Sequence, residues 1–225
     1  MGENAIYKVD GHSGTGYLAI PAIGSGPAVI VIQEWWGLVG HIKDVVNRFA
    51  DEGFVAFAPD LYHGQVAKEP DTARKLMMEL DLDSAAREIT AAAQYLLNLP
   101  QTDSDHVATV GFCMGGALSI WGASLASSIK HAVAFYPSTA WDRHLPRWEN
   151  FKGKSVMIHC SQGDGTSAAP GIQKAKSEIE KAGGEVELFD YEKTAHAFFN
   201  SDRPEVYNKA AAELAWERTI KFLRS

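Results

Sequence analysis

The chain has 225 residues, of which 46% are hydrophobic and 22% charged, a balance that is ordinary for a globular protein with one substantial core. Its formal net charge of −7 argues against nucleic acid or an anionic membrane as a partner, because binding to either depends on clustered Lys and Arg. We find no membrane-spanning apolar run, no signal-peptide pattern and no interdomain linker. We therefore expect a single cytoplasmic domain over residues 1–225, with Cys113 and Cys160 as free thiols.

Short β-rich apolar segments alternate along the chain with longer helical ones, which is typical of a mostly parallel central sheet with helices on both faces. The predicted strands, in chain order, are 16–20, 28–33, 55–58, 107–111, 131–136, 155–159 and 185–189. The predicted helices are 42–52, 84–99, 114–127, 170–182 and 204–223. The glycine-rich segment 11–16 lacks the Lys-Ser/Thr ending of a phosphate loop and a helix after it, which indicates a hairpin turn instead.

The most informative motif is Gly111-Phe112-Cys113-Met114-Gly115, a nucleophile elbow with cysteine where serine is usual. A predicted strand turns there directly into a predicted helix, which strains the backbone at the turn and requires small neighbours. This geometry lifts the thiol of Cys113 clear of the sheet and aims the Met114 N–H at an anion formed beside it. The alternative is that Cys113 is a small buried hydrophobe, as free cysteines usually are.

A base and an acid for this thiol follow in the order of the α/β-hydrolase triad. Asp164 lies in a glycine-rich loop just after a predicted strand, and His196 lies in a small-residue loop between the last strand and the C-terminal helix. Loops at the carboxyl ends of parallel strands converge, so these side chains can meet Cys113. Taken singly, Asp164 can be a turn former and His196 a solvated loop residue. Their joint occurrence with the elbow favours the triad.

A fourth candidate group is Glu34, where the apolar strand 28–33 runs into a carboxylate and two tryptophans. Glu34 can hold the thiol by a hydrogen bond or tune its proton affinity, and the Trp35 N–H can be the second oxyanion donor beside that of Met114. Alternatively, Glu34 caps the helix that begins near Ile42 or lies in solvent.

Together these residues resemble the dienelactone hydrolase family, the cysteine members of the α/β-hydrolase fold, over nearly the whole chain. The segments that carry the resemblance are Gln33-Glu34-Trp35-Trp36-Gly37, Ala58-Pro59-Asp60-Leu61-Tyr62, the elbow with Gly116, Gly163-Asp164 and Ala195-His196-Ala197-Phe198-Phe199-Asn200. The resemblance implies a triad of Cys113, Asp164 and His196, with Glu34 as the carboxylate that contacts the thiol and helps to generate thiolate. It also implies the opening of an enol-lactone, 4-carboxymethylenebut-2-en-4-olide, in chloroaromatic catabolism. We expect no cofactor.

The chain departs from the family pattern where the substrate carboxylate would bind. Family members carry an arginine four residues after the catalytic histidine, and this chain has Asn200 there. A second family arginine would fall near Pro70, where the closest cation is Arg74. An asparagine brings no charge, so recognition of a carboxylate substrate is in question. The cations that can supply the charge instead are Arg74, Arg143 and Arg203.

We expect a monomeric hydrolase for a small lactone or activated ester. The side chains expected to bind substrate are Trp36, Tyr62, Phe198, Asn200 and Arg74. A carboxylesterase or thioesterase for small neutral esters is the alternative enzyme, favoured by Asn200 and the aromatic residues. From another class, a non-catalytic binding protein or thiol sensor would use Cys113 as an oxidisable switch. No pair of histidines has metal-ligand spacing, so we expect no metal.

Overall fold

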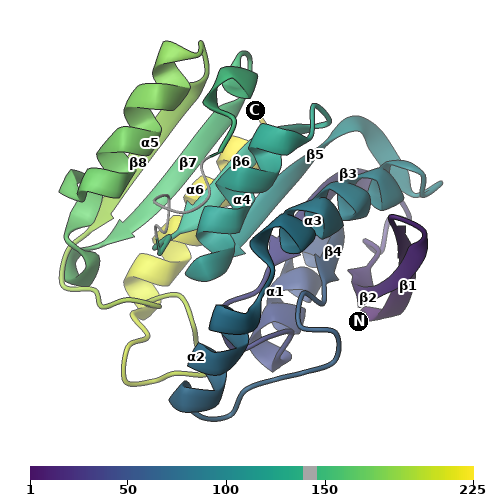
Figure 1. Ribbon diagram of the computed structural model, residues 1–225, viewed down its shortest axis with the longest axis horizontal. Coiled ribbons are helices and arrows are strands. Elements are labelled where there is room, and N and C mark those ends of the chain that lie inside the picture. The colour runs from purple at the N-terminus through teal and green to yellow at the C-terminus, as the bar shows by residue number, and fades with distance from the viewer. Residues whose placement is uncertain (139–145) are drawn as a thin grey trace.

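An eight-stranded sheet is the centre of the computed structural model, which describes residues 1–138 and 146–225 (Figure 1). The strands lie in the order β1-β2-β4-β3-β5-β6-β7-β8. Strands β3 to β8 run parallel, whereas β1 and β2 pair antiparallel at one edge. Their bounds are β1 Glu3–Val9, β2 His12–Ala19, β3 Gly26–Ile32, β4 Val55–Pro59, β5 Thr102–Phe112, β6 Ile129–Phe135, β7 Ser155–Ser161 and β8 Glu185–Tyr191. The predicted mostly parallel α/β-hydrolase architecture is confirmed.

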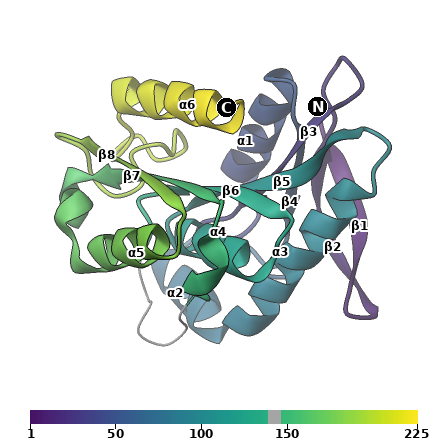
Figure 2. The same cartoon turned by 90° about the horizontal axis from the view of Figure 1, so that it is seen from above.

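Helices cover both faces of the sheet, with α1 and α6 on one side and α3, α4 and α5 on the other (Figure 2). The helix bounds are α1 Gly40–Asp51, α2 Pro70–Glu79, α3 Leu82–Leu97, α4 Met114–Leu125, α5 Pro170–Lys181 and α6 Lys209–Leu223. Within the part of the chain that the structure describes, no helix is both long and apolar enough to cross a bilayer.

The two layers of helices produce two hydrophobic cores, and β3 contributes to both. Because side chains alternate between the faces of a strand, Ile30 and Ile32 pack in the core beneath α3 and α4. Val29 and Val31 pack in the core beneath α1 and α6. A strand buried on both faces reads as a continuous apolar run, which is why β3 is evident in the sequence.

One strand and one α-helix are absent from the sequence-based prediction, besides three short 3-10 helices. Strand β1 was missed because only Tyr7 and Val9 are buried along it, while Ile6 is 68% exposed. Helix α2 was missed because it buries only Ala73 and Leu76, too few residues for a clear helical period. Both elements are therefore stabilised by contacts with neighbouring elements, and their sequences carry no strong periodic pattern.

Two predicted boundaries are also corrected. The hairpin turn lies at Asp10 and Gly11, and the rest of the glycine-rich segment belongs to β2. Helix α6 begins at Lys209 rather than at Pro204, because the side chain of Asn208 caps it by accepting a hydrogen bond from the Ala211 N–H.

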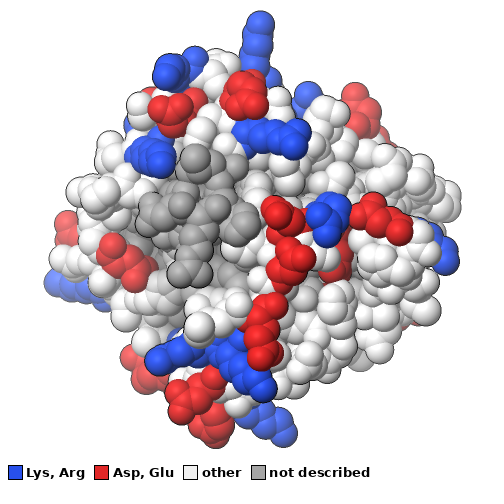
Figure 3. Space-filling view, viewed as in Figure 1, with Lys and Arg blue, Asp and Glu red and all other residues white. Residues whose placement is uncertain are grey.

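Acidic and basic side chains are intermixed on the face of the molecule seen in Figure 3. Lys and Arg do not gather there into a broad basic patch among the described residues.

The turn between β5 and α4 is tight because the backbones of two glycines approach other backbone atoms closely. A Cβ added to Gly111 would lie 1.9 Å from the carbonyl oxygen of Gly115, and one added to Gly115 would lie 2.4 Å from that of Gln33. The helix therefore starts directly above the strand only because neither position carries a side chain.

We predict that Gly111→Ala destabilises the fold by about 3 kcal/mol or more, because its methyl group would overlap a backbone carbonyl that cannot move without displacing α4. Gly40→Ala is the control, since a Cβ at the start of α1 meets nothing within 4 Å. That variant should be neutral or stabilised by about 0.4–1 kcal/mol. Urea unfolding of both variants tests the contact, and equal stability of the two would contradict it.

Candidate active site

The candidate nucleophile Cys113 lies between β5 and α4, at the carboxyl edge of the sheet. Its backbone has φ 55° and ψ −117°, a region that non-glycine residues rarely adopt. The conformation is held by a hydrogen bond from the Cys113 N–H to the Phe135 carbonyl at 3.0 Å. The thiol is half-buried at the N-terminus of α4, where the helix dipole favours negative charge.

Asp164 and His196 meet at the same edge of the sheet. Asp164 ends the short 3-10 turn Gln162–Asp164 after β7, and His196 lies in the segment between β8 and α6. The distance from His196 Nδ1 to Asp164 Oδ2 is 2.8 Å, and the Ser161 hydroxyl donates to the same carboxylate oxygen. Burial raises the pKa of Asp164, but these two hydrogen bonds outweigh it and the net pKa is lowered. Asp164 is therefore suited to hold an imidazolium.

The imidazole of His196 faces the thiol as well as the carboxylate. Burial lowers the pKa of His196, but its hydrogen bonds with Asp164 and Cys113 outweigh burial and raise that pKa to about 10. The protonated ring is thus stabilised between the two partners. A base in this position can accept the thiol proton and later activate water.

Two backbone N–H groups flank the thiol where an oxyanion would form. Met114 is the first residue of α4, and Trp35 follows the end of β3. Among the described residues, no hydrogen bond engages either N–H. Both donors can therefore serve an incoming oxyanion.

Glu34 is buried between neutral hydrogen-bond donors, and in the described part of the chain its carboxylate makes no hydrogen bond to Cys113. Its side chain is 2% exposed, with Oε1 accepting from the Tyr136 hydroxyl at 3.2 Å and Oε2 from the Asn200 amide at 2.7 Å. Burial raises the pKa of Glu34, while hydrogen bonds from Asn200 and Tyr136 and the charges of His196 and Arg203 lower it in part.

Asn200 and Phe198, which were expected to bind substrate, lie in the protein interior. Asn200 is 2% exposed and its amide donates to Glu34. Phe198 is fully buried, with its ring 5.4 Å from that of Tyr136 and 4.9 Å from that of Tyr191. Both side chains therefore support the site from within rather than lining its surface.

The other expected substrate-binding residues lie at different distances from the thiol. Tyr62 lies close to the thiol. Burial, and to a smaller extent the charge of Cys113, raises the pKa of Tyr62. Its hydroxyl lies 3.7 Å from Met114 Sδ. Trp36 is partly exposed and packs edge-on against Trp35 at 5.1 Å. Arg74 is exposed on α2, and no contact among the described residues joins it to the triad.

Of the alternative cations that the structure describes, Arg203 lies nearer to the site than Arg74. Its guanidinium is 5.8 Å from the centre of the Trp36 ring and pairs with Glu205 at 2.9 Å. Arg143 lies outside the described residues.

Three residues of the site were missed in the sequence. They are Tyr136, which binds Glu34, Ser138, whose Oγ lies 3.9 Å from Cys113 Sγ, and Ser161, which binds Asp164. Ser161 ends a strand and the other two lie within three residues of the end of one, so inspection of every strand terminus would have found them.

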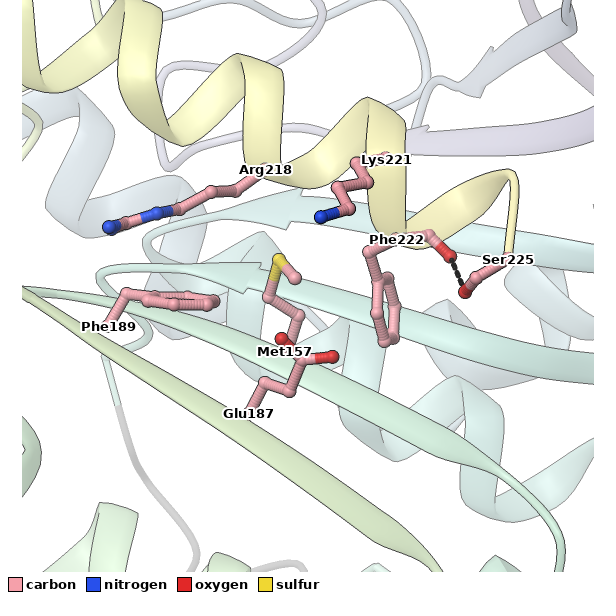
Figure 4. A pocket seen from close by; sticks show the side chains of 7 residues that line it. All are labelled: Met157, Glu187, Phe189, Arg218, Lys221, Phe222 and Ser225. Carbon is pink, nitrogen blue, oxygen red and sulfur yellow. Dashed lines mark hydrogen bonds between the residues drawn. The ribbon is translucent and has the colours of Figure 1, made fainter.

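A separate cavity of about 370 Å³ lies beneath α6, over the faces of β7 and β8 (Figure 4). It is lined by Met157, Glu187, Phe189, Arg218, Lys221, Phe222 and Ser225, none of which belongs to the triad. Among the residues described, no three His, Cys, Asp or Glu side chains converge in a metal-binding cluster.

Known proteins resemble this chain over its full length. Protein usf of Aquifex pyrophilus is 36% identical, with 100% of this chain and 98% of that protein aligned. The carboxymethylenebutenolidase of Pseudomonas putida is 27% identical over 97% of this chain and 94% of its own. A solved dienelactone hydrolase-like promiscuous phosphotriesterase from metagenomic libraries superposes with a TM-score of 0.81 at 20% identity, covering 99% of this chain and 96% of its own, which shows the shared fold.

Residues 15–225 match the dienelactone hydrolase family. The matched segment includes the elbow, the Asp164 loop, the His196 loop and every strand except β1 and part of β2. Since the match takes in nearly the whole chain, this protein belongs to the dienelactone hydrolase family.

Proposed function

We propose that the protein is a hydrolase that opens enol-lactones or cleaves small activated esters through Cys113, His196 and Asp164. The observation that carries the proposal is the position of His196, which contacts the Asp164 carboxylate and the Cys113 thiol at one edge of the sheet. A thiol at a helix N-terminus beside an imidazole held by a carboxylate is an arrangement suited to nucleophilic acyl transfer.

In the proposed cycle, His196 takes the thiol proton and the Cys113 sulfur attacks the ester carbonyl. The N–H groups of Met114 and Trp35 hold the resulting oxyanion. Collapse of this intermediate breaks the carbonyl carbon–oxygen bond, and the His196 imidazolium gives its proton to the departing oxygen. A thioester then remains on Cys113; the alcohol of an ester leaves, whereas the enol of an opened lactone stays attached to the acyl group. His196 next deprotonates a water that attacks the thioester, and cleavage of the carbon–sulfur bond releases the carboxylic acid while His196 returns the proton to the Cys113 sulfur.

A carboxylesterase or thioesterase for small neutral esters is the second candidate. It is favoured by the placement of Asn200 against Glu34, because no cation occupies the position of the family arginine. A non-catalytic thiol sensor would keep the same fold but would turn over no ester.

We predict that Cys113→Ala abolishes turnover of p-nitrophenyl acetate. Deleting a nucleophile costs several orders of magnitude in kcat, and the nearby Ser138 hydroxyl makes no contact with His196 among the described residues. Steady-state kinetics measure the loss. Retention of more than about a tenth of the wild-type kcat would remove Cys113 from the nucleophile role.

Cys113→Ser is the sharper test of how the nucleophile is prepared. Serine fits the elbow but is far less acidic than cysteine, so His196 and Glu34 should deprotonate it poorly. We expect a much lower kcat with unchanged thermal stability. A serine variant as active as the wild type would indicate an ordinary serine-type site in which Glu34 plays no part.

We predict that a carboxylate-bearing dienelactone reacts no better than a neutral lactone or ester of similar size. The family arginine is absent, and Arg203 is already paired with Glu205. A charge-assisted hydrogen bond contributes about 1.5–3 kcal/mol, which would change the ratio of kcat/KM values about ten- to a hundredfold. A strong preference for the charged substrate would contradict loss of the anion site, and Arg203→Gln would then show whether Arg203 supplies it.

A further inference from the structure

Three polar side chains from distant parts of the chain meet beneath the candidate triad. Glu34 follows β3, Tyr136 follows β6, and Asn200 lies in the segment between β8 and α6. Each is at most 2% exposed. The Glu34 carboxylate accepts one hydrogen bond on each oxygen, from Tyr136 at 3.2 Å and from Asn200 at 2.7 Å. A buried carboxylate that lost one of these donors would keep an unsatisfied oxygen.

Asn200 also fixes the loop that carries His196. Its own N–H donates to the Ala197 carbonyl at 2.9 Å, and its side-chain oxygen accepts from the Asp202 N–H at 3.0 Å. The amide is thereby oriented with its nitrogen toward Glu34. A single side chain joins the His196 loop to the end of β3.

The charges around Glu34 leave it without a direct ion pair. The groups that face it are Tyr136 from the end of β6, and His196 and Arg203 from the segment between β8 and α6. Arg203 forms an ion pair with Glu205. Among the described residues, no Lys or Arg lies within ion-pair distance of the Glu34 carboxylate. Neutral donors therefore hold this buried acid.

We propose that Asn200 is a positioning residue: its amide hydrogen bond holds the Glu34 carboxylate and favours its ionised form beside His196 before substrate binds, which adapts the site to substrates without negative charge. This inference rests on the hydrolase function proposed above. The Asn200 amide brings no positive charge that could pair with a substrate carboxylate. A substrate anion would therefore be repelled by the negative charge of Glu34 without a cation at position 200 to offset the repulsion, whereas a neutral ester would not.

Asn200→Ala tests the proposal through a pH profile. Because the lost donor stabilised the ionised carboxylate, the acid limb of kcat/KM for p-nitrophenyl acetate should move to higher pH. At neutral pH the variant should lose about ten- to a hundredfold in kcat/KM and regain part of it as the pH rises. A purely structural role would lower activity by the same factor at every pH, and an unmoved acid limb would overturn the proposal.

Asn208→Asp is the matched control. Asn208 lies in the same C-terminal region but caps α6, where aspartate serves as well as asparagine. This variant should keep the wild-type acid limb and kcat/KM. A shift as large as that of Asn200→Ala would show that the limb does not report on the contact with Glu34.

A double variant separates the hydrogen bond from the position of the charge. Glu34→Gln combined with Asn200→Asp exchanges donor and acceptor, so the contact remains while the negative charge moves to position 200. We expect a melting temperature close to that of the wild type but kcat/KM at least about tenfold lower at every pH. Wild-type activity in this variant would overturn the proposal even if Asn200→Ala fails to fold.

The outcomes also distinguish this inference from the proposed function. If Cys113→Ala retains ester turnover, the hydrolase mechanism itself fails. If Cys113→Ala is inactive and Asn200→Ala has an unmoved acid limb, only the positioning role fails.

Discussion

The close approach of Gly111 to the carbonyl of Gly115 is the contact on which the candidate site depends. It lets β5 pass into α4 without an intervening loop, so Cys113 takes the strained φ of 55° at the start of a helix. Strain of this kind persists only when the surroundings determine it, and the hydrogen bond from Cys113 to Phe135 contributes to that. The parallel sheet then brings Glu34, Asp164 and His196 to the same edge, because each follows the carboxyl end of a strand.

The ionisable side chains at this edge lie in two connected layers: an upper one of Cys113, His196 and Asp164, and a lower one around Glu34. In the upper layer, Asp164 and Cys113 stabilise the protonated form of His196. In the lower layer, Tyr136 and Asn200 donate hydrogen bonds to the buried carboxylate of Glu34. Burial raises the pKa of that carboxylate, and the charge of His196 lowers it in part. Tyr136 contacts both layers, since its ring lies 5.1 Å from that of His196 and its hydroxyl donates to Glu34. Its backbone has a positive φ of 37°. The use of neutral donors, Tyr136 and Asn200, to hold this carboxylate distinguishes the site from one built on an arginine.

The sequence predicts the parts of the molecule whose patterns are local. β3 is a continuous apolar run buried on both faces, and Gly111 is explained by a backbone contact with Gly115 in the same motif. Gly115 fits the motif as well, although the backbone that it contacts is that of Gln33. Strand β1 and helix α2 could not be found in this way, because each buries few residues and depends on its neighbours. The same holds for Asn200. Its partner Glu34 lies 166 residues away, and an asparagine four residues after His196 looks like a surface contact until the fold places it in the interior.

Direct observation of the acyl-enzyme tests the central claim, that the Cys113 sulfur is the nucleophile, most directly. The protein would be mixed with p-nitrophenyl acetate, quenched in acid during turnover and digested, and the peptides analysed by mass spectrometry. The account predicts one acetyl group per chain, bound to Cys113 as a thioester that hydroxylamine removes, with Cys160 unmodified. Continued turnover with no adduct on Cys113, or with the acetyl group on another side chain, would contradict it.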